Sequence, residues 1–472
     1  MGEHPTAEGE VGAALARLEE LGAAHLWVQY ADYNGRSQGK SVPRARFAAA
    51  LAGGITFARA NLGFNLTDTQ APDTIFGADS GDFLAVPDPA ALAPLPYAPG
   101  AARAIAWMRR DDGSPWEGCP RSALRRQVEA YAARGLSLRV AFEPEAYLFE
   151  TGPDGPRPIA ADGMFTVAAL ERTAAFLQAV GGTLEAMGVE VEQVAPEYGP
   201  GQIEINIRHA EPVKAADDLV TLKDAVRAIA RGQGLIASFM PKPFAAIAGC
   251  GLHVHLSLWH TDGRSALAGD GDEGGGEGGG GDDGEGGGGK RGAHPSGFGS
   301  TGRGFLGGIL AHARALCGLG APTLNSYKRL LPGSWAPAHA AYAVANRSTL
   351  VRIPGASRQR VEFRAGDNTS NPYIFLAGLL AAGLDGIERK LDPGPPAAGD
   401  LGHLSPAALA AQGIALLPRT AGEALDAVAA AETLLAALGP TVGTEWLKVK
   451  RSELAIAETV VSAWERETYL RG

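Results

Sequence analysis

The sequence predicts an α+β protein with a small N-terminal domain and a larger domain after it. Between residues 120 and 260, helical and strand-like patterns alternate irregularly, which is typical of an α+β fold rather than of regular βαβ winding. A polar segment with Pro and Gly, DDGSPWEGCP at 111–120, indicates a boundary. With 472 residues, of which 45% are hydrophobic, the chain can bury a large core. We therefore expect one domain at 1–112 and another at 113–472.

The first domain is expected to be mostly sheet. After a short amphipathic helix at 11–22, HLWVQYADYNGRSQGKSVP at 25–43 predicts two strands joined by a turn at the Asn-Gly pair 34–35, because Asn-Gly is a strong hairpin signal. Mixed strand and Pro-rich loop follow to about residue 100, including PDPAALAPLPYAPG at 87–100. A further strand is expected at 102–110.

The second domain is expected to open with a helix at 120–134, which has Pro120 near its start and Gly135 just after its end. The patterns that follow predict strand 137–149, helix 166–187, strand 189–195, strand 201–208, helix 212–233 and strand 251–259. The apolar run at 374–384 is too short to span a bilayer and predicts a buried helix.

One segment has a composition that cannot pack into a core. Residues 269–289, GDGDEGGGEGGGGDDGEGGGG, carry seven acids and no apolar side chain, so we expect a disordered surface loop there.

Charge and cysteine content argue against several classes of protein. The formal net charge of −10 argues against sequence-independent binding to nucleic acid. Three widely spaced cysteines and an acidic N-terminus without signal-peptide character favour a cytoplasmic protein with no membrane anchor.

Paired carboxylates in AFEPEAYLFE at 141–150 raise the first question about function. Glu143 and Glu145 leave the same face of the expected strand, where like charges repel unless a cation lies between them. A solvated sheet face is the plainer interpretation of one isolated Glu-x-Glu. Three further stretches place polar side chains on one face: Glu197 and Glu204 in PEYGPGQIEINIRH, His253, His255 and Ser257 in GCGLHVHLSLW, and Arg360, Glu362 and Arg364 in SRQRVEFRAGD.

Five carboxylates and a histidine on strands favour a hard cation. Carboxylate oxygens with one imidazole suit Mg²⁺ or Mn²⁺, whereas zinc prefers more His or Cys ligands. Arginines beside such cations indicate phosphate chemistry, although no GxxxxGK[ST] loop is present. A metallohydrolase or a cupin-like oxygenase built on His253 and His255 is an alternative, but it lacks a further His and leaves the arginines unexplained.

Long motifs over nearly the whole chain resemble the glutamine synthetase family. In chain order they are EPEAYLF, PGQIEI, KPF with GCGLHVHLSL, NSYKRLLPGSWAP, NRSTLVRIP and RVEFRAGDNTSNPYIFLAGLLAAGLDGI. The resemblance implies an N-terminal β-grasp domain, matched by VQYADYNGRSQGKSVP, and a catalytic domain with a curved antiparallel sheet and flanking helices. It also implies a cytosolic homo-oligomer, a dodecamer of two hexameric rings, with each active site between two subunits.

The resemblance assigns site residues position by position. The matched ligands of a first Mg²⁺ or Mn²⁺ are Glu145, Glu197 and Glu204, and those of a second are Glu143, His253 and Glu362. Glutamate would be held by Arg329 at its α-carboxylate and by Arg364 at its γ-carboxylate, with Gly249 in the glutamate loop. The matched ATP contacts are His255, Ser257 and Arg360, with Arg347 and Arg352 facing the phosphates. Arg347 and Arg364 are expected to act in catalysis.

Three departures from the family pattern lie on the acceptor side. Ala58 stands where ammonia-using members carry an aspartate, Trp335 replaces the flap glutamate, and Ala248 replaces an asparagine. An ammonium ion needs several acceptors, whereas an alkylammonium has an apolar tail that an indole can face with cation–π attraction. The implied reaction passes through γ-glutamyl phosphate, which a small primary amine then attacks. Glu197 is the candidate base.

The flap SWAP, the segment NRSTLVRIP and the C-terminal VVSAWERETYL resemble the γ-glutamylmethylamide synthetase branch of the family. An ordinary glutamine synthetase that uses ammonia is the alternative, and a non-catalytic structural relative is a second one. Retention of all six matched metal ligands argues against the non-catalytic relative, because a scaffold has no need for converging like charges. The sequence leaves open the amine, the base, the oligomer size and the pathway.

Overall fold

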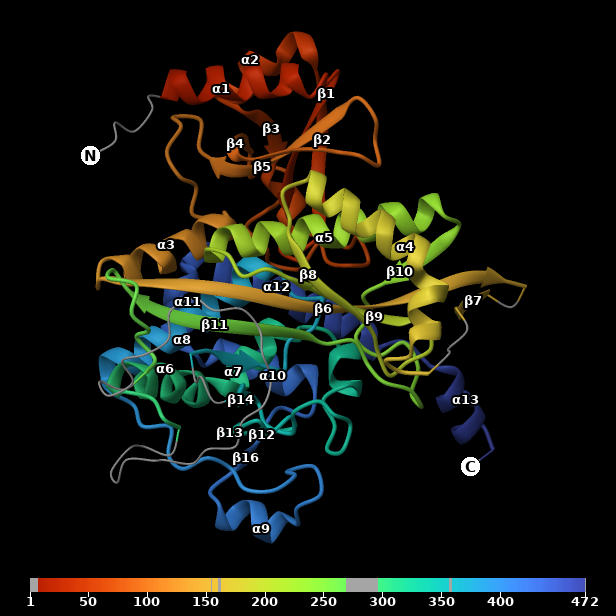
Figure 1. Ribbon diagram of the computed structural model, residues 1–472, viewed down its shortest axis with the longest axis vertical. Helices are drawn as coiled ribbons and strands as arrows, with labels where there is room; N and C mark the ends of the chain where they lie inside the picture. Colours follow the sequence, from red (N-terminus) through yellow and green to blue (C-terminus); the bar gives the residue numbers. More distant parts are fainter. Residues whose placement is uncertain (1–6, 154, 160–162, 269–295, 356–358, 472) are drawn as a thin grey trace.

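The computed structural model describes residues 7–153, 155–159, 163–268, 296–355 and 359–471. The chain forms a smaller N-terminal domain on top of a larger one, and two long strands of the larger domain cross the middle of the molecule (Figure 1). The disorder predicted for 269–289 falls outside the described residues.

The N-terminal domain is a five-stranded sheet with two helices. Its strands are β1 (His25–Ala31), β2 (Ser37–Pro43), β3 (Ile55–Ala58), β4 (Asp82–Pro94) and β5 (Ala101–Arg109), and its helices are α1 (Ala7–Glu20) and α2 (Phe47–Gly53). The spatial order is β2-β1-β5-β4-β3. The strands β1 and β5 are parallel, and the other pairs are antiparallel. The predicted hairpin at 25–43 is confirmed.

The turn of this hairpin docks on the second domain. Gly35 has a φ of 73°, and a Cβ at this position would lie 2.8 Å from the carbonyl oxygen of Ser370. The side-chain amide of Asn371 donates to the backbone oxygen of Asp32 at 2.7 Å. The turn therefore needs glycine both for its left-handed backbone and for its close approach to the second domain.

The prediction of mixed strand and loop to residue 100 was wrong for 87–94. These residues continue β4, which pairs with β5 along most of its length. The pairing register shifts between Pro87 and Leu92, so Pro89 lies at an irregularity of the strand. Proline is tolerated at such a bulge because its missing N–H removes no ladder hydrogen bond there.

The second domain is built on a nine-stranded sheet. Its strands are β6 (Leu136–Gly152), β7 (Gly155–Pro158), β8 (Val191–Pro196), β9 (Gln202–Ile207), β10 (Leu235–Ser238), β11 (Leu252–His260), β13 (Tyr342–Val344), β14 (Val351–Ile353) and β15 (Val361–Phe363). The path runs β13-β14-β15-β11-β6-β9-β8, and β7 and β10 also pair with β6. Only the β13–β14 pair is parallel among these described strands. A short ladder joins β12 (His339–Ala340) to β16 (Ala415–Leu416).

Helices cover this sheet and build the core. They are α3 (Pro120–Ala132), α4 (Val167–Ala186), α5 (Pro212–Gly232), α6 (Ser300–Ala311), α7 (Ala313–Gly320), α8 (Pro372–Arg389), α9 (Pro406–Ala411), α10 (Ala421–Ala429), α11 (Glu432–Leu438), α12 (Pro440–Glu458) and α13 (Ala463–Tyr469). The helix predicted at 374–384 is confirmed as the buried part of α8, which contacts α3, α6 and α11. No helix in the described part of the chain has the length and apolarity to cross a bilayer.

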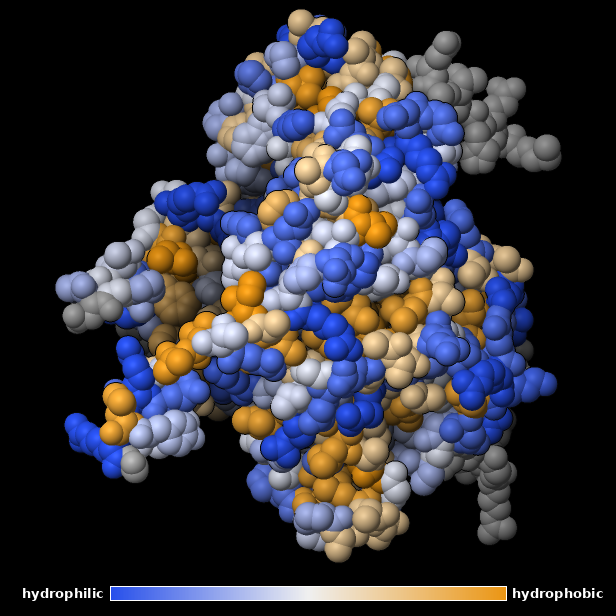
Figure 2. Space-filling view, turned by 180° about the vertical axis from the view of Figure 1, so that it is seen from behind, coloured by the Kyte–Doolittle hydropathy of each residue, from blue (hydrophilic) through white to orange (hydrophobic). Residues whose placement is uncertain are grey.

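The C-terminal end of the chain projects from the body. The helix α13 lies at the edge of the molecule in Figure 1, and the arm at the lower left of Figure 2 shows apolar and charged residues side by side. Val460, Val461 and Trp464 are each more than 60% exposed. This arm therefore adds apolar surface that the core of a single chain does not bury.

A buried ion-pair network joins the two domains. Arg121 of α3 donates to both carboxylate oxygens of Asp217 on α5, at 3.0 and 2.6 Å, and also contacts Asp88 of β4 at 2.8 Å. Its guanidinium lies 3.7 Å from the ring centroid of Trp107 on β5. The hydroxyl of Tyr373 on α8 donates to Asp217 at 2.7 Å. Burial alone would lower the pKa of Arg121, but these anions hold it well above its ordinary value.

Candidate active site

The pairing register of the large sheet brings the predicted carboxylates and histidines together. Glu143 on β6 lies opposite His253 on β11, and His255 lies opposite Glu362 on β15. On the other side of β6, Glu145 lies opposite Glu204 on β9. The predicted strands are therefore neighbours, and the alternation of side chains along each strand points these groups to one face of the sheet.

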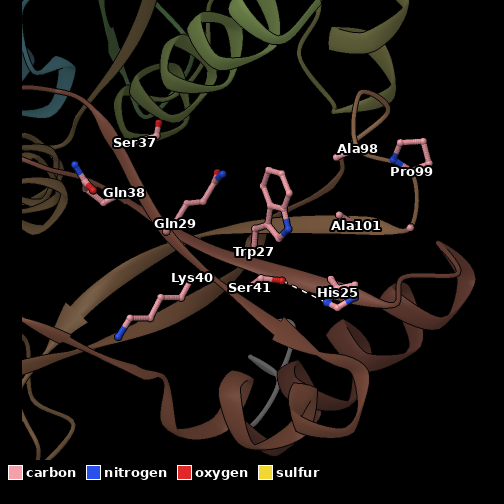
Figure 3. Close-up of a pocket in the computed structure, with 12 residues that line it drawn as sticks. His25, Trp27, Gln29, Ser37, Gln38, Lys40, Ser41, Ala98, Pro99 and Ala101 are labelled. Atoms are coloured by element: carbon pink, nitrogen blue, oxygen red, sulfur yellow. Dashed lines mark hydrogen bonds between the residues drawn. The ribbon is translucent and has the colours of Figure 1, made fainter. Parts of the chain in front are cut away.

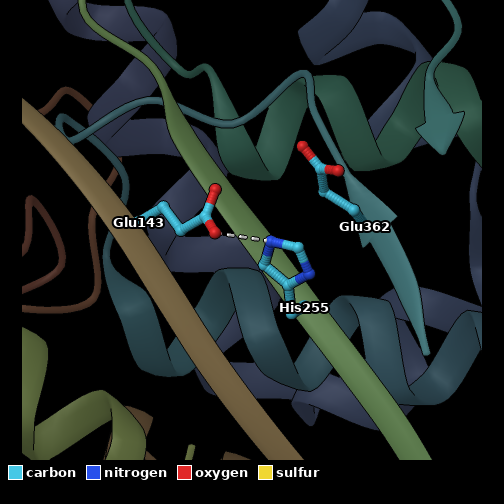
Figure 4. Close-up of side chains that lie close together, drawn as sticks. All are labelled: Glu143, His255 and Glu362. Atoms are coloured by element: carbon cyan, nitrogen blue, oxygen red, sulfur yellow. Dashed lines mark ion pairs between the residues drawn. The ribbon is translucent and has the colours of Figure 1, made fainter. Parts of the chain in front are cut away.

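Glu143 lies at the centre of this cluster. Its carboxylate lies 2.9 Å from Nε2 of His255 and 3.5 Å from Nδ1 of His253. Figure 4 shows Glu143, His255 and Glu362 converging from three adjacent strands. Burial raises the pKa of Glu143, but the two imidazoles outweigh this effect and hold its pKa well below the ordinary value.

Glu362 is fully buried between two arginines. One carboxylate oxygen accepts a hydrogen bond from Arg352 and the other accepts one from Arg364. Burial would raise the pKa of Glu362, but nearby His253 and the two arginines bring it down to about 2. Glu362 is therefore a carboxylate at any physiological pH.

Glu145 is held by residues that the sequence analysis did not single out. Its Oε2 accepts from the side-chain amide of Gln202 at 2.8 Å and from the backbone N–H of Gly251 at 3.0 Å. The Asn368 side chain donates to the backbone oxygens of both Glu145 and Gly251, which ties these strands together. Gln202 precedes Glu204 by two positions on β9, so strand alternation could have placed it on the same face.

The remaining two carboxylates of the cluster, Glu204 and Glu197, have raised pKa values. Burial first, and then the charges of Glu143, Glu145 and Glu197, raise the pKa of Glu204 to about 9. Burial and the charge of Glu145 raise the pKa of Glu197 to about 7, against a smaller opposing effect of Arg347. Such shifts are expected where like charges converge in a buried site.

These residues fit divalent cations. Ligand atoms of Glu143, His255 and Glu362 lie within 4.8 Å of one another, and the same is true of Glu143, Glu204 and His253. Among the described residues, neither ring nitrogen of buried His255 has an aligned hydrogen-bond partner. A mixed carboxylate and imidazole donor set of this kind suits Mg²⁺ or Mn²⁺.

The grouping differs in one respect from the ligand sets that the resemblance implies. His255, expected as an ATP contact, lies in one cation-sized group with Glu143 and Glu362, while His253 lies in the other group with Glu143 and Glu204. Both histidines face the cluster because they are two positions apart on β11. The division of the ligands between two cations therefore stays a prediction.

A small space next to the cluster is kept open by glycine. A Cβ added to Gly251 would lie 2.8 Å from a guanidinium nitrogen of Arg329, 3.1 Å from Glu145 and 3.2 Å from His253. Arg329 is buried and donates to the backbone oxygens of Arg364 and Ala365 at 3.1 and 3.3 Å. Burial lowers the pKa of Arg329. A buried cation next to carboxylates is an arrangement that can receive a carboxylate substrate.

Gly249 is equally constrained. A Cβ at this position would meet the carbonyl oxygen of Pro241 at 2.5 Å and the side chain of Arg329 at 2.9 Å. The preceding carbonyl, that of Ala248, accepts from the hydroxyl of Tyr147 at 2.7 Å. The loop before β11 is therefore packed against Arg329 and anchored to β6.

Arg364 connects the cluster to the flap that carries Trp335. Besides Glu362, it donates to the backbone oxygens of Arg347 at 3.2 Å and of Trp335 at 3.4 Å. Trp335 has a left-handed backbone, with a φ of 61°, and a largely exposed side chain. Its ring stacks on Tyr198, which directly follows Glu197, at 5.6 Å between centroids.

The two cation-sized groups leave out three expected site residues. Ser257 follows His255 by two positions and accepts a hydrogen bond from the indole of Trp259 at 2.9 Å. Arg360 is exposed and lies just before β15. Ala58 is exposed at the end of β3, which Figure 1 places in the upper domain and away from β9 and β14. A single chain therefore does not bring Ala58 to Trp335.

A separate hollow of about 700 Å³ lies on the N-terminal domain. Figure 3 shows it over β1 and β2, lined by residues that include His25, Trp27, Gln29 and Lys40. None of the described residues that line it is a carboxylate, so it lacks the ligands that a hard divalent cation prefers.

Comparisons with known families agree with this geometry. Residues 14–116 match the model described as the glutamine synthetase N-terminal domain. Residues 117–277 and 291–469 match the model described as the glutamine synthetase catalytic domain. Together the two models cover most of the chain, including every residue of the acidic cluster.

Individual relatives match over nearly their full length. The glutamine synthetase of Halobacterium salinarum is 33% identical over 467 residues, covering 97% of this chain and 96% of the relative. The glutamate–methylamine ligase of Methyloversatilis universalis is 33% identical over 464 residues, covering 96% and 97%. A solved structure described as a GmaS/ADP complex superimposes with a TM-score of 0.83 at 30% identity, covering 97% of this chain and 99% of that one. The chain therefore belongs to the glutamine synthetase family and is an ATP-dependent carbon–nitrogen ligase.

Proposed function

We propose that this enzyme joins a small primary amine, rather than ammonia, to the γ-carboxylate of glutamate. The observation that carries the proposal is Trp335, whose indole stands where the family pattern has a glutamate and stacks on Tyr198, the residue directly after Glu197. An indole removes one acceptor for ammonium and offers an apolar surface with cation–π attraction to an alkylammonium. Ala58 removes a second carboxylate from the same side.

The names of the relatives include ligases for an amine and ligases for ammonia. One is named a glutamate–methylamine ligase, and two superimposed structures are described as GmaS. Other relatives of similar identity are named glutamine synthetase. The choice between amine and ammonia therefore depends on the acceptor side of this chain, and there the replaced acids favour the amine.

The remaining site residues take roles in the two chemical steps. An oxygen of the glutamate γ-carboxylate attacks the terminal phosphorus of ATP, ADP leaves, and the acyl phosphate forms. The amine nitrogen then attacks the acyl carbon, phosphate leaves, and a proton is lost. Arg329 and Arg364 hold the two carboxylates of glutamate, Arg347 and Arg352 face the phosphates, and His255, Ser257 and Arg360 contact ATP.

Mg²⁺ or Mn²⁺ would be held by the six matched ligands, with His255 within reach of the same cluster, and would neutralise phosphate charge. Before it can attack, the amine must lose a proton, because alkylamines are mostly protonated at neutral pH. The Glu197 carboxylate is our candidate acceptor of that proton, since it directly precedes Tyr198, on which the indole of Trp335 stacks. Most of the catalytic effect would then come from positioning and charge stabilisation.

A second copy of the chain would complete the acceptor side. Ala58 lies exposed on the N-terminal domain and far from the cluster of its own chain, so its predicted role requires the cluster of another subunit. A cytoplasmic homo-oligomer, with the ring arrangement that the family resemblance implies, would supply this contact. Size determination in solution by light scattering tests for an oligomer.

An acceptor panel in a phosphate-release assay tests the function. With glutamate and ATP saturating, methylamine, ethanolamine or a short alkylamine should give a higher kcat/KM than ammonium. Restoring both acids with Ala58→Asp and Trp335→Glu should shift the preference towards ammonium. Ammonium outperforming every amine on the unaltered enzyme would return the protein to the ordinary glutamine synthetases. Absence of glutamate-dependent phosphate release would indicate a non-catalytic relative.

A further inference from the structure

Three aromatic side chains form a ladder that begins at the acceptor side of the site. The rings of Tyr198 and Trp335 stack with centroids 5.6 Å apart at 30°, and Phe165 meets Tyr198 edge-on at 6.0 Å and 80°. Their exposed fractions are 56% for Phe165, 44% for Tyr198 and 64% for Trp335. The rings are therefore in contact with one another while much of their surface faces solvent.

The ladder joins three distant segments of the chain. Phe165 precedes α4, Tyr198 lies in the turn between β8 and β9, and Trp335 lies on the flap before β12. Phe165 and Trp335 both have left-handed backbones, with φ of 55° and 61°. Bulky residues adopt this conformation rarely, so the surrounding structure must maintain it at a cost.

Hydrogen bonds from residues of the site hold the backbone around Tyr198 and Trp335. The turn that holds Tyr198 is fixed by the side chain of Gln202, which accepts from the N–H of Gly199 at 2.8 Å and donates to Glu145 at 2.8 Å. The backbone oxygen of Trp335 accepts from Arg364 at 3.4 Å. One end of the aromatic surface thus lies on the flap residue that Arg364 holds, and Phe165 forms the other end, with its backbone N–H donating to the oxygen of Pro196 at 3.2 Å.

We propose that Phe165, Tyr198 and Trp335 determine acceptor specificity by covering the apolar tail of the amine, so that the preferred acceptors are primary amines with several carbons rather than methylamine. The proposal rests on the proposed function and narrows its substrate class. Methylamine is too short to reach past Trp335 to the outer rings, whereas a chain of several methylenes or an aryl group can follow the ladder. Aromatic faces and edges suit such a tail because they bury apolar area without taking up hydrogen-bonding groups.

The burial of each methylene sets the expected size of the effect. Removing one methylene from water changes an equilibrium by about fourfold. The kcat/KM should therefore rise about fourfold per carbon over the first few carbons and then level off at the outer edge of Phe165. Most of the gain should appear in KM for the amine, because the tail contacts are made equally in the ground state and the transition state.

The test is a series of ammonium, methylamine, propylamine, pentylamine and phenethylamine with the full-length enzyme. Tyr198→Ala should flatten the dependence of kcat/KM on chain length, and Phe165→Ala should weaken it only for pentylamine and phenethylamine. Tyr198→Phe keeps the stacked ring and should keep the dependence. Ile236→Ala truncates an exposed apolar side chain on β10, outside the ladder, and should leave the series unchanged.

Hydroxylamine, a nucleophile without a tail, serves as the check on folding and chemistry. Its turnover to the hydroxamate should stay within about twofold in Ile236→Ala, and in Tyr198→Ala and Phe165→Ala it should fall less than the kcat/KM for pentylamine does. The ladder proposal would be overturned if kcat/KM in the unaltered enzyme did not depend on the chain length of the amine. It would also be overturned if Tyr198→Ala and Phe165→Ala both kept that dependence unchanged. Either result would leave the proposed function, an amine ligase, standing. Preference for ammonium over all amines would instead overturn the proposed function.

Discussion

Glu145 and Glu204 lie directly opposite each other on the antiparallel strands β6 and β9. Like charges in this position destabilise a sheet, and burial adds to the penalty. Burial and three neighbouring carboxylates raise the pKa of Glu204 to about 9, so the metal-free protein keeps this group protonated at neutral pH. The pair is therefore a site that costs stability unless a proton or a cation neutralises it.

This relationship predicts how stability depends on pH and on metal. In protein treated with a chelator, the stability associated with protonated Glu204 is complete below its ordinary pKa of 4.5 and is lost as pH rises towards 9. The thermal midpoint should thus be lower at pH 9 than at pH 6, and millimolar Mg²⁺ or Mn²⁺ should raise it by binding the folded state.

Glu204→Gln should reduce the fall in midpoint between pH 6 and pH 9 and remove most of the gain from the metal. Glu190→Gln, at an exposed ion pair with Arg208, is the matched control and should behave as the unaltered protein does. An unchanged metal response in Glu204→Gln would show that the cations bind elsewhere.

His253→Ala and Glu362→Ala should each lower phosphate release by more than about 100-fold. Loss of a partner that merely orients a metal ligand typically costs 10–100-fold, and these two residues lie in the cluster itself. The control is His403→Ala, whose exposed ring pairs with exposed Asp400. Near-native turnover of either cluster variant with an intact assembly would refute its assignment as a metal ligand.

Arg329→Gln should raise the KM for glutamate far more than it lowers the affinity for ATP. The guanidinium is buried beside Gly249 and Gly251, and two backbone oxygens orient it towards the space between Glu145 and His253. Isothermal titration with glutamate and with a non-hydrolysable ATP analogue separates the two effects. Equal losses for both ligands would indicate a general collapse of the site.

Removing Arg121 from the ion-pair network between the domains should lower the free energy of unfolding by several kcal/mol. Arg121→Met leaves Asp217 and Asp88 without their shared cation, and such an unpaired buried charge typically costs about 3–5 kcal/mol. The midpoint of thermal unfolding at fixed protein concentration should fall accordingly. The exposed pair of Arg44 and Glu19 supplies the control, because Arg44→Met should cost less than about 1 kcal/mol.

Deletion of residues 270–288 should leave activity and assembly almost unchanged. Their sequence offers no apolar side chain to pack, and a shorter loop costs little in closure entropy. The described residues on either side are already close, since Ala268 and Phe298 form an isolated β-bridge. A collapsed assembly or an inactive enzyme would reveal a docking role for the segment.

The sequence by itself determined the family, the order of helices and strands and the face on which Glu143 and Glu145 lie. These features follow from local periods and long motifs, and the strand alternation of β6, β9 and β11 repeats every two residues. The same local rules failed at 87–94, where Pro and Ala are poor strand formers but pairing with β5 holds the segment in the sheet. Tertiary pairing outweighed propensity there.

Only the tertiary structure decided which of these groups meet. The alignment of Glu145 with Glu204, and of His255 with Glu362, depends on the register between strands far apart in the chain, which no local period specifies. The ladder of Phe165, Tyr198 and Trp335 likewise joins three loops whose ends are positioned by the sheet and helices around them. Strand periodicity shows which side chains share a face, but contacts between loops are set by the packing of the whole domain, so the aromatic ladder could be found only in the folded chain.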